Sequence, residues 1–358
     1  METEILIRIA AATLAAALIS LIATPPVRRL AIKIGAMDIP KDNRRMHKTP
    51  MPLIGGLAIF ISFAVSSLVF MGLDEMKLSI YIGAVIIILL GVFDDIYDIK
   101  AIIKFIVQII VAVILISDGI LIDGFSVFGT YVNLGWMAYP ITTLWIVALV
   151  NAFNLIDGLD GLSCGMSAIC CISLFVVAML MGNTHSAMLA AVLFGACVGF
   201  LPYNFYPAKI FMGDTGAYFL GYMMAVISIE GVFKVSAVIS FLLPIIIFAL
   251  PLFDTIFAFT RRILKGEGPF TPDKKHLHHR LIEAGLSQRQ AVGVLYSICA
   301  FCGIAAIVAT DAFFADMPYM KWIILFGAGA VTVVIDYVLS SHRQYRKSIK
   351  NAKSEDKN

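Results

Sequence analysis

The sequence predicts an all-α protein that crosses a membrane many times, and three observations support this fold class. Hydrophobic residues make up 60% of the 358 residues, and charged residues only 14%. Soluble proteins carry charged residues at about a quarter of their positions. Mean hydropathy is +0.92, and the polar residues gather in short stretches between long apolar segments. Such a chain is solvated mainly by lipid rather than folded around one water-soluble core.

About eleven apolar segments are expected to cross the membrane as helices, because a helix satisfies its own backbone hydrogen bonds in lipid. Some are shorter than the ~20 residues that a hydrocarbon layer of ~30 Å requires, but polar residues bracket each of them. The segments are 5–24, 53–72, 78–93, 101–117, 138–153, 163–182, 186–203, 214–229, 236–259, 291–310 and 320–340.

Lysine and arginine gather in alternate connections, and this pattern orients the chain. If the N-terminus lies outside, only Arg8, Lys77, Lys234 and Lys321 fall away from the cytoplasmic side. The first segment lacks a basic stretch before it, and its flanking charges follow it, which is typical of a retained anchor rather than a cleaved signal peptide. We therefore expect a multi-pass protein of the plasma (inner) membrane with its N-terminus outside and its C-terminus in the cytoplasm.

A single transmembrane catalytic domain is expected over residues 1–340, followed by a charged cytoplasmic tail at 341–358. Residues 118–137 alternate apolar and polar types among several glycines, which predicts a small β-hairpin on the outer face. A site for a soluble reactant would lie in the connections that face the cytoplasm. These are 25–52, 94–100, 154–162, 204–213 and 260–290.

Aspartates follow three of the expected helices, always on the side predicted to be cytoplasmic. They are Asp94, Asp95 and Asp98 after the third helix, Asp157 and Asp160 after the fifth, and Asp214 after the seventh. Six carboxylates that converge on one face repel one another unless a cation or protons compensate their charge. Mg²⁺ prefers such oxygen ligands and leaves positions for substrate phosphates. The alternative is that each group is a set of solvated loop residues.

Several neighbours of these aspartates fit a ligand site. Asn154 precedes Asp157 by three residues, so that it could share a helix face and bind a metal-held water or a phosphate. Gly158 and Gly161 alternate with the aspartates, and Gly213 precedes Asp214. Glycine permits close approach of the backbone to a ligand, although each glycine alone is an ordinary turn residue.

A basic constellation accompanies the acidic one. The connection 260–290 contains RRILKGEGPFTPDKKHLHHRL, and three interpretations stay open for its histidines. They could form a zinc site, which requires pre-oriented ligands, or belong to a solvated basic loop. They could also recognise an anion such as a phosphate or a sugar phosphate. The connection 25–52 adds basic residues before Thr49. Basic loops around an acidic centre suit a phosphate-rich substrate, and a site at the membrane surface implies that one reactant is a lipid.

Taken in order, HKTPMPLIGG, DDIYD, NAFNLIDGLDGL, NFYPAKIFMGDTG and HLHH resemble the motifs of the polyprenyl-phosphate N-acetylhexosamine-1-phosphate transferases. The resemblance spans nearly the whole chain. The HxHH form of the histidine motif and the eleven-span arrangement are similar to the branch that starts teichoic-acid or O-antigen synthesis. They differ from the ten-span translocase that transfers phospho-MurNAc-pentapeptide, which is the alternative within the family.

The resemblance implies a reaction and a set of site residues. N-acetylhexosamine 1-phosphate, with N-acetylglucosamine as the expected sugar, would pass from a UDP-sugar to polyprenyl (undecaprenyl) phosphate with release of UMP. The expected catalytic residues are Asp94, Asp95, Asp157 and Asp160, and the expected metal ligands are Asp214, Asp95 and Asn154. The expected nucleotide-binding residues are Lys48, Thr49, Gly158, Leu159, Asn204 and Phe211, and those expected to face the diphosphate and sugar are His276, His278, His279 and Arg280.

The resemblance also implies Mg²⁺ as the cofactor, with Mn²⁺ as a substitute, and no nucleic-acid partner. Its partners would be the UDP-sugar, the polyprenyl phosphate and the bilayer, and a homodimer is compatible with its lipid-facing surfaces. A polyprenyl phosphate is largely ionised near pH 7, because the second pKa of a phosphate is about 6. The aspartate pair could therefore serve as a base or only position the lipid, and a single step or a covalent aspartyl intermediate both stay open.

Two other functions compete with this interpretation. A membrane prenyltransferase would use DDIYD as a DDxxD motif, but the second motif is then too rich in glycine and HLHH is unexplained. An ion-coupled transporter would need acidic residues near the bilayer midplane in broken helices. Pro244 and Pro251 could break the ninth helix around Asp254, whereas the other acids cluster at the ends of helices.

Overall fold

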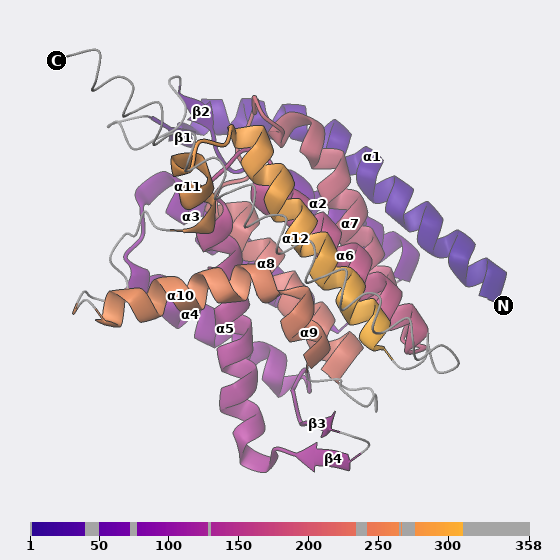
Figure 1. Cartoon of the computed structure of the whole chain (residues 1–358). Coiled ribbons are helices and arrows are strands. Elements are labelled where there is room, and N and C mark those ends of the chain that lie inside the picture. Colours follow the sequence, from indigo (N-terminus) through magenta and orange to yellow (C-terminus); the bar gives the residue numbers. More distant parts are fainter. Residues whose placement is uncertain are drawn as a thin grey trace.

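The computed structural model describes residues 2–39, 50–71, 77–127, 130–233, 242–264, 266 and 276–310. These residues form a bundle of helices with two very small sheets (Figure 1). The long helices are α1 (Glu2–Ile34), α2 (Gly56–Met71), α3 (Leu78–Tyr97), α4 (Ala101–Ser117), α5 (Ala138–Ile156), α6 (Leu162–Leu180), α7 (Thr184–Asn204), α8 (Gly213–Ser228), α10 (Ala249–Leu264) and α12 (Gln288–Ala309). The short ones are η1 (Gly135–Met137), η2 (Ile229–Phe233), α9 (Leu242–Ile247) and α11 (Leu277–Glu283).

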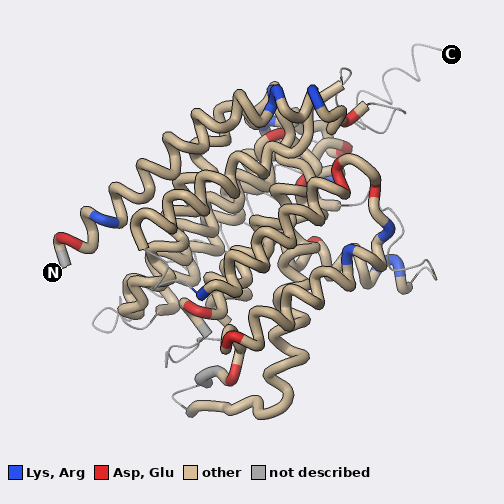
Figure 2. The backbone as a smooth tube through the Cα atoms, turned by 180° about the vertical axis from the view of Figure 1, so that it is seen from behind, with Lys and Arg blue, Asp and Glu red and all other residues tan. Residues whose placement is uncertain are grey.

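The expected class of a polytopic all-α membrane protein is confirmed. Seven helices of the described part are long and apolar enough to cross a membrane, and α2 and α4 are shorter apolar helices. Few Lys, Arg, Asp or Glu residues interrupt the middles of the long helices (Figure 2). The expected eleventh segment, 320–340, and the tail 341–358 lie outside the described residues.

Burial differs strongly between the helices and places α8 at the centre. Its spanning window is 94% buried, whereas that of α1 is 22% buried. Helix α8 packs against α3 and α5, while α1 packs along α7 and α2 at the periphery (Figure 1). The polar end of α8 therefore begins where α3 and α5 finish, and this meeting point contains the aspartates.

Two helices continue beyond the ends that the sequence predicted for them. Helix α1 continues through Pro25 and Pro26 to Ile34, so that part of the expected connection 25–52 is helical. Helix α3 continues to Tyr97, which places Asp94 and Asp95 in a last helical turn rather than in a loop. Hydropathy detects where the lipid contact ends, whereas backbone hydrogen bonding carries a helix further into the polar region.

The expected ninth segment, 236–259, is wrong as one continuous helix. The structure divides its described part into α9 and α10, and α10 runs across the bundle instead of along it (Figure 1). Pro251 lies in the first turn of α10, where its missing N–H removes no intrahelical bond. The change of direction brings Asp254 toward α11.

The predicted hairpin is confirmed as an element. Strand β3 (Gly124–Val127) pairs antiparallel with β4 (Thr130–Asn133), with Gly124 opposite Asn133. A second pair, β1 (Met37–Asp38) with β2 (Met51–Pro52), was not expected from the sequence. Two-residue strands leave too short a pattern to recognise, yet this pair brings Asp38 to the polar end of α3 and α8.

Candidate active site

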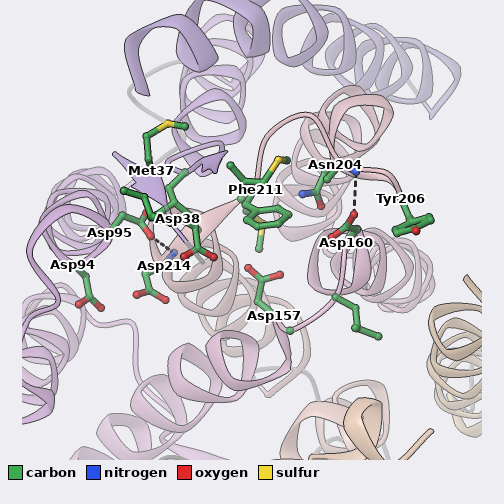
Figure 3. Close-up of a pocket in the computed structure, with 18 of the residues that line it drawn as sticks. Met37, Asp38, Asp94, Asp95, Asp157, Asp160, Asn204, Tyr206, Phe211 and Asp214 are labelled. Atoms are coloured by element: carbon green, nitrogen blue, oxygen red, sulfur yellow. Dashed lines mark hydrogen bonds between the residues drawn. The ribbon is translucent and has the colours of Figure 1, made fainter. Parts of the chain in front are cut away.

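A cavity of about 1000 Å³ opens at the polar ends of α3, α5 and α8. All six aspartates from the three motifs line it, so the structure brings together residues that lie up to 120 positions apart. Asp38 from β1 joins them, and in Figure 3 its carboxylate faces the same space as those of Asp157 and Asp214. The cavity is strongly acidic and open to solvent.

Asp95 holds the start of α8. Its Oδ1 accepts a hydrogen bond from the Asp214 N–H at 2.8 Å, and its Oδ2 accepts two from Thr215, from N–H at 3.1 Å and from Oγ1 at 2.6 Å. A carboxylate at a helix N-terminus satisfies unpaired N–H groups and opposes the positive end of the helix dipole. Gly213, at φ +71°, makes room, because a Cβ there would lie 2.5 Å from Asp95 Oδ2. These bonds use three of the about four acceptor positions of the carboxylate.

Asp94 is buried and ties three helices together. Its Oδ1 accepts the Ile99 N–H at 2.9 Å, at the turn from α3 to α4. Its Oδ2 accepts the Tyr218 hydroxyl of α8 at 2.7 Å and lies 2.6 Å from Lys104 Nζ of α4. Asp98 ends α3 in the left-handed conformation at φ 51° and is exposed. Asp94 is therefore bonded through both carboxylate oxygens in the wall of the cavity, with Lys104 as its ion-pair partner.

Asp214 is linked to α5. Asn154 Nδ2 donates a hydrogen bond of 2.5 Å to Asp214 Oδ1. This bond holds together two of the residues that the sequence predicted as metal ligands.

The segment after α5 carries Asp157 and Asp160 on a tight turn. Asp160 Oδ2 accepts the Ala208 N–H at 2.9 Å and so fixes this turn to the segment before α8 (Figure 3). Burial, together with the nearby charges of Asp95 and Asp160, raises the pKa of Asp157 to about 8. A carboxyl group with such a pKa is largely protonated at neutral pH until a cation compensates its charge.

The predicted nucleotide residues lie on the other wall of the cavity. Gly158, Leu159, Asn204 and Phe211 line it, and Asn204 is held by donating to the Ile210 carbonyl at 3.1 Å. Lys48 and Thr49 lie outside the described residues. The wall thus offers the Phe211 ring, a buried amide and open backbone near the aspartates.

The structure divides the expected histidine group. His279 lines the cavity, whereas His276 and His278 are buried behind it and Arg280 is exposed. His276 is bonded to Asp254 of α10 at 2.9 Å. Within the described residues no three His, Cys, Asp or Glu side chains form a group that could hold a metal ion. The three histidines therefore do not constitute a zinc site in this arrangement.

A family model described as glycosyl transferase family 4 matches residues 77–232. A relative from Bacillus subtilis (strain 168), named "Probable undecaprenyl-phosphate N-acetylglucosaminyl 1-phosphate transferase", is 47% identical over 87% of this chain and 88% of its own length. The chain belongs to glycosyl transferase family 4. The sequence-based assignment to this family is confirmed.

Two further relatives resemble the chain over most of its length. A "Decaprenyl-phosphate N-acetylglucosaminephosphotransferase" from Mycolicibacterium smegmatis is 34% identical over 91% of this chain and 87% of its own. An "Undecaprenyl-phosphate alpha-N-acetylglucosaminyl 1-phosphate transferase" from Salmonella typhi is 32% identical over 84% of this chain and 83% of its own. The family 4 match contains every aspartate of the three motifs and ends before the histidine motif.

Some residues of this family 4 site were missed by sequence reasoning. Lys104 and Tyr218 contact Asp94, and Asp38, Tyr206 and Gln288 line the cavity. Asp38 carried only a weak signal, because Asp42 lies in the same basic connection. Lys104 looked like one more cytoplasmic charge, and Tyr218 like one more apolar position of a spanning helix.

Proposed function

We propose that this chain transfers N-acetylglucosamine 1-phosphate from UDP-N-acetylglucosamine to undecaprenyl phosphate. The products are UMP and undecaprenyl-diphosphate-N-acetylglucosamine, so the chain is a polyprenyl-phosphate phosphotransferase. The observation that carries the proposal is the acidic cavity at the polar end of the bundle, in a chain 47% identical to a relative named for this activity. The lipid product would be the first membrane-bound intermediate of a cell-envelope glycopolymer.

The reaction forms one bond and breaks one. An oxygen of the lipid phosphate attacks the β-phosphorus of the UDP-sugar, and the bond from the β-phosphorus to the bridging oxygen breaks. UMP departs with the electron pair of that bond. The attacking phosphate is already largely ionised near neutral pH, because its second pKa is about 6. The chain's contribution is therefore chiefly orientation and charge compensation rather than proton removal.

Lys104 is well placed to balance the charge of the acceptor. Its Nζ lies 2.6 Å from Asp94 Oδ2, and Asp94 lines the cavity, so an ammonium group is held directly behind this part of the cavity wall. Asp94 and Asp95 are both held by three interactions with neighbouring groups. We assign these two residues to holding Lys104 and the start of α8 in place.

The donor set of the cavity fits Mg²⁺. Asp214 and Asp157 line the cavity with carboxylate oxygens, which are hard ligands, and the Asn154 amide is bonded to Asp214. Mg²⁺ uses one or two carboxylates plus substrate phosphates, so it needs no preformed group of three protein ligands. When bound, Mg²⁺ would neutralise the diphosphate and make UMP a better leaving group. Asp214, Asn154 and Asp157 are the residues that would hold it, and Mn²⁺ could replace it.

The opposite wall suits the nucleotide and the sugar. The Phe211 ring and the buried Asn204 amide provide a stacking surface and a polar contact beside Gly158 and Leu159. His279 faces the cavity from α11. The excess of basic residues on this side favours the cytoplasmic face of the plasma membrane, where nucleotide sugars are present.

The proposal is tested with purified protein in detergent, undecaprenyl phosphate, Mg²⁺ and a panel of UDP-sugars. UDP-N-acetylglucosamine should release UMP only when the lipid is present. UDP-MurNAc-pentapeptide belongs in the panel because it tests the translocase alternative. Release of UMP from the pentapeptide substrate alone would reassign the donor, and no release with any sugar would refute the proposal.

Asp214→Asn tests the predicted metal position. The substitution keeps the size of the side chain and removes the charge that would bind the metal, so turnover should fall by about 10³-fold or more. An unchanged thermal unfolding temperature would show that the loss is chemical. Near-normal turnover of this variant would place the metal position elsewhere.

A further inference from the structure

Asp254 is an acidic residue in the second turn of α10, a helix whose sequence reads as a membrane segment. In a transporter such a residue would serve ion coupling near the bilayer midplane. The structure gives it two partners outside α10 instead. Its Oδ2 lies 2.9 Å from His276 Nδ1, and its Oδ1 accepts the Leu277 N–H at 2.9 Å.

These contacts join α10 to the start of α11. His276 is the residue before this helix, and its side chain makes no capping hydrogen bond of its own. Asp254 replaces that cap from another helix, because its carboxylate accepts the first N–H of α11. The side chains of His276 and Asp254 are 6% and 10% exposed, so the pair is shielded from water.

The carboxylate also fixes the protonation pattern of His276. An ionised carboxylate only accepts hydrogen bonds, so the proton of the imidazole must lie on Nδ1. A ring with a single proton therefore keeps it on Nδ1, and its Nε2 carries the lone pair. Carboxylates that orient metal-bound histidines contribute about 10- to 100-fold to metal affinity or activity, and we take this range as the scale for His276.

Ring contacts connect His276 to His279 at the cavity through His278. The His276 and His278 rings are parallel within 4°, with centroids 5.8 Å apart, and His278 lies 4.3 Å from His279. Neither ring nitrogen of His278 has a hydrogen-bond partner among the described residues. Burial, with the neighbouring imidazoles, lowers its pKa to about 3, so this ring is neutral.

His278 also contacts the turn that carries Asp157. A Cβ on Gly158 would lie 2.2 Å from His278 Nε2, so the absence of a side chain there lets the ring pack on the backbone. His279 is the member of the three that lines the cavity. The position of His279 and that of the Asp157 turn therefore both depend on how the His276 end of α11 is held.

We propose that Asp254 is a positioning residue for donor-substrate binding, holding His276 and α11 so that His278 seats on Gly158 and His279 faces the cavity. The inference rests on the proposed function only for the identity of the donor, a UDP-sugar. It assigns a role to Asp254, which is the single acidic residue of α10 and does not line the cavity. The lipid acceptor is expected to be indifferent to Asp254, because Lys104 and Asp94 lie on other helices.

The test is Asp254→Asn. Its amide oxygen can keep the Leu277 bond, while its NH₂ group now faces His276 Nδ1 and forces the imidazole proton onto Nε2. We expect kcat/KM for UDP-N-acetylglucosamine to fall by about 10- to 100-fold, with KM for undecaprenyl phosphate unchanged. Asp254→Glu should recover part of the loss. Asp118→Asn is the matched control, since this acid accepts a bond from Ser79 and does not line the cavity.

A second readout does not depend on turnover. In protein labelled with ¹⁵N-histidine, the His276 signals, assigned by their absence from His276→Gln, should show Nδ1–H in the wild type and Nε2–H in Asp254→Asn. Asp254→Asn combined with His276→Gln should be no worse than the poorer single variant. An unchanged His276 tautomer, or losses that multiply in the double variant, would overturn the assignment. Absent turnover in the wild type would refute the proposed function while the tautomer still decides the role of Asp254.

Discussion

The hydroxyl of Thr215 offers a direct test of how Asp95 acts. Thr215 is fully buried, and its Oγ1 donates to Asp95 Oδ2 at 2.6 Å. Thr215→Val keeps the branched shape and removes this one bond, while the two backbone N–H bonds to Asp95 remain. A hydrogen bond to a charged group contributes about 1.5–3 kcal/mol net. If that energy holds the start of α8, the variant should lose stability by this order.

The same energy sets the expected loss of activity. Asp214 begins the helix that Asp95 holds, so displacement of this end misplaces the predicted metal ligand. A loss of 1.5–3 kcal/mol in transition-state stabilisation corresponds to about a 10- to 150-fold decrease in kcat/KM. The assay is UMP release at saturating and limiting UDP-N-acetylglucosamine, with the unfolding temperature measured on the same preparation.

Thr24→Val is the control for removal of a buried hydroxyl. Thr24 is also fully buried, but its Oγ1 donates to the Ser20 carbonyl of its own helix at 2.7 Å. Loss of such an intrahelical bond is nearly neutral, because the carbonyl keeps its backbone partner. If Thr215→Val retained wild-type kcat/KM and stability, the idea that Asp95 positions α8 would be wrong.

Further predictions concern Lys104, Asp157 and the divalent metal ion. Lys104→Met should leave Asp94 buried without its counter-ion and raise KM for undecaprenyl phosphate by at least about tenfold. Lys104→Arg should raise this KM less. An equal rise in KM for the UDP-sugar would contradict the assignment. The pKa of Asp157 rises from 3.8 to about 8 on folding, so its contribution to stability is present below pH 4 and is lost as the pH rises through 8. Without divalent cations the unfolding temperature should therefore fall between pH 4 and 8, and less so in Asp157→Asn; equal slopes would refute the shift. EDTA should abolish turnover and Mg²⁺ restore it, whereas full activity in EDTA would exclude the metal.

The sequence predicted most helices because each has to be apolar over its whole length. The acids stood out for the same reason, since an aspartate such as Asp214 has no place in lipid unless it has a function. Their common side followed from the positions of Lys and Arg, and the structure places all three motifs around one cavity. The apolar segments and the placement of charged residues between them could therefore be interpreted without any knowledge of packing.

Side-chain contacts between different segments could not be predicted from the sequence. Tyr218 lies four residues after Asp214, and nothing in that spacing indicates that its hydroxyl bonds Asp94 of another helix. Likewise, the division of the segment 236–259 into α9 and α10 decides that Asp254 reaches His276. Contacts of this kind depend on where helices cross and bend, which is settled by tertiary packing rather than by local composition.

The fate of the sugar's phosphate tests the central claim most directly. UDP-N-acetylglucosamine labelled with ³²P at the β-phosphate is incubated with the protein, Mg²⁺ and undecaprenyl phosphate, and the lipid and aqueous phases are separated. Transfer of N-acetylglucosamine 1-phosphate predicts that the label enters the lipid phase and that the nucleotide product is unlabelled UMP. Label that stays in the aqueous phase as UDP, with sugar alone in the lipid, would contradict the account.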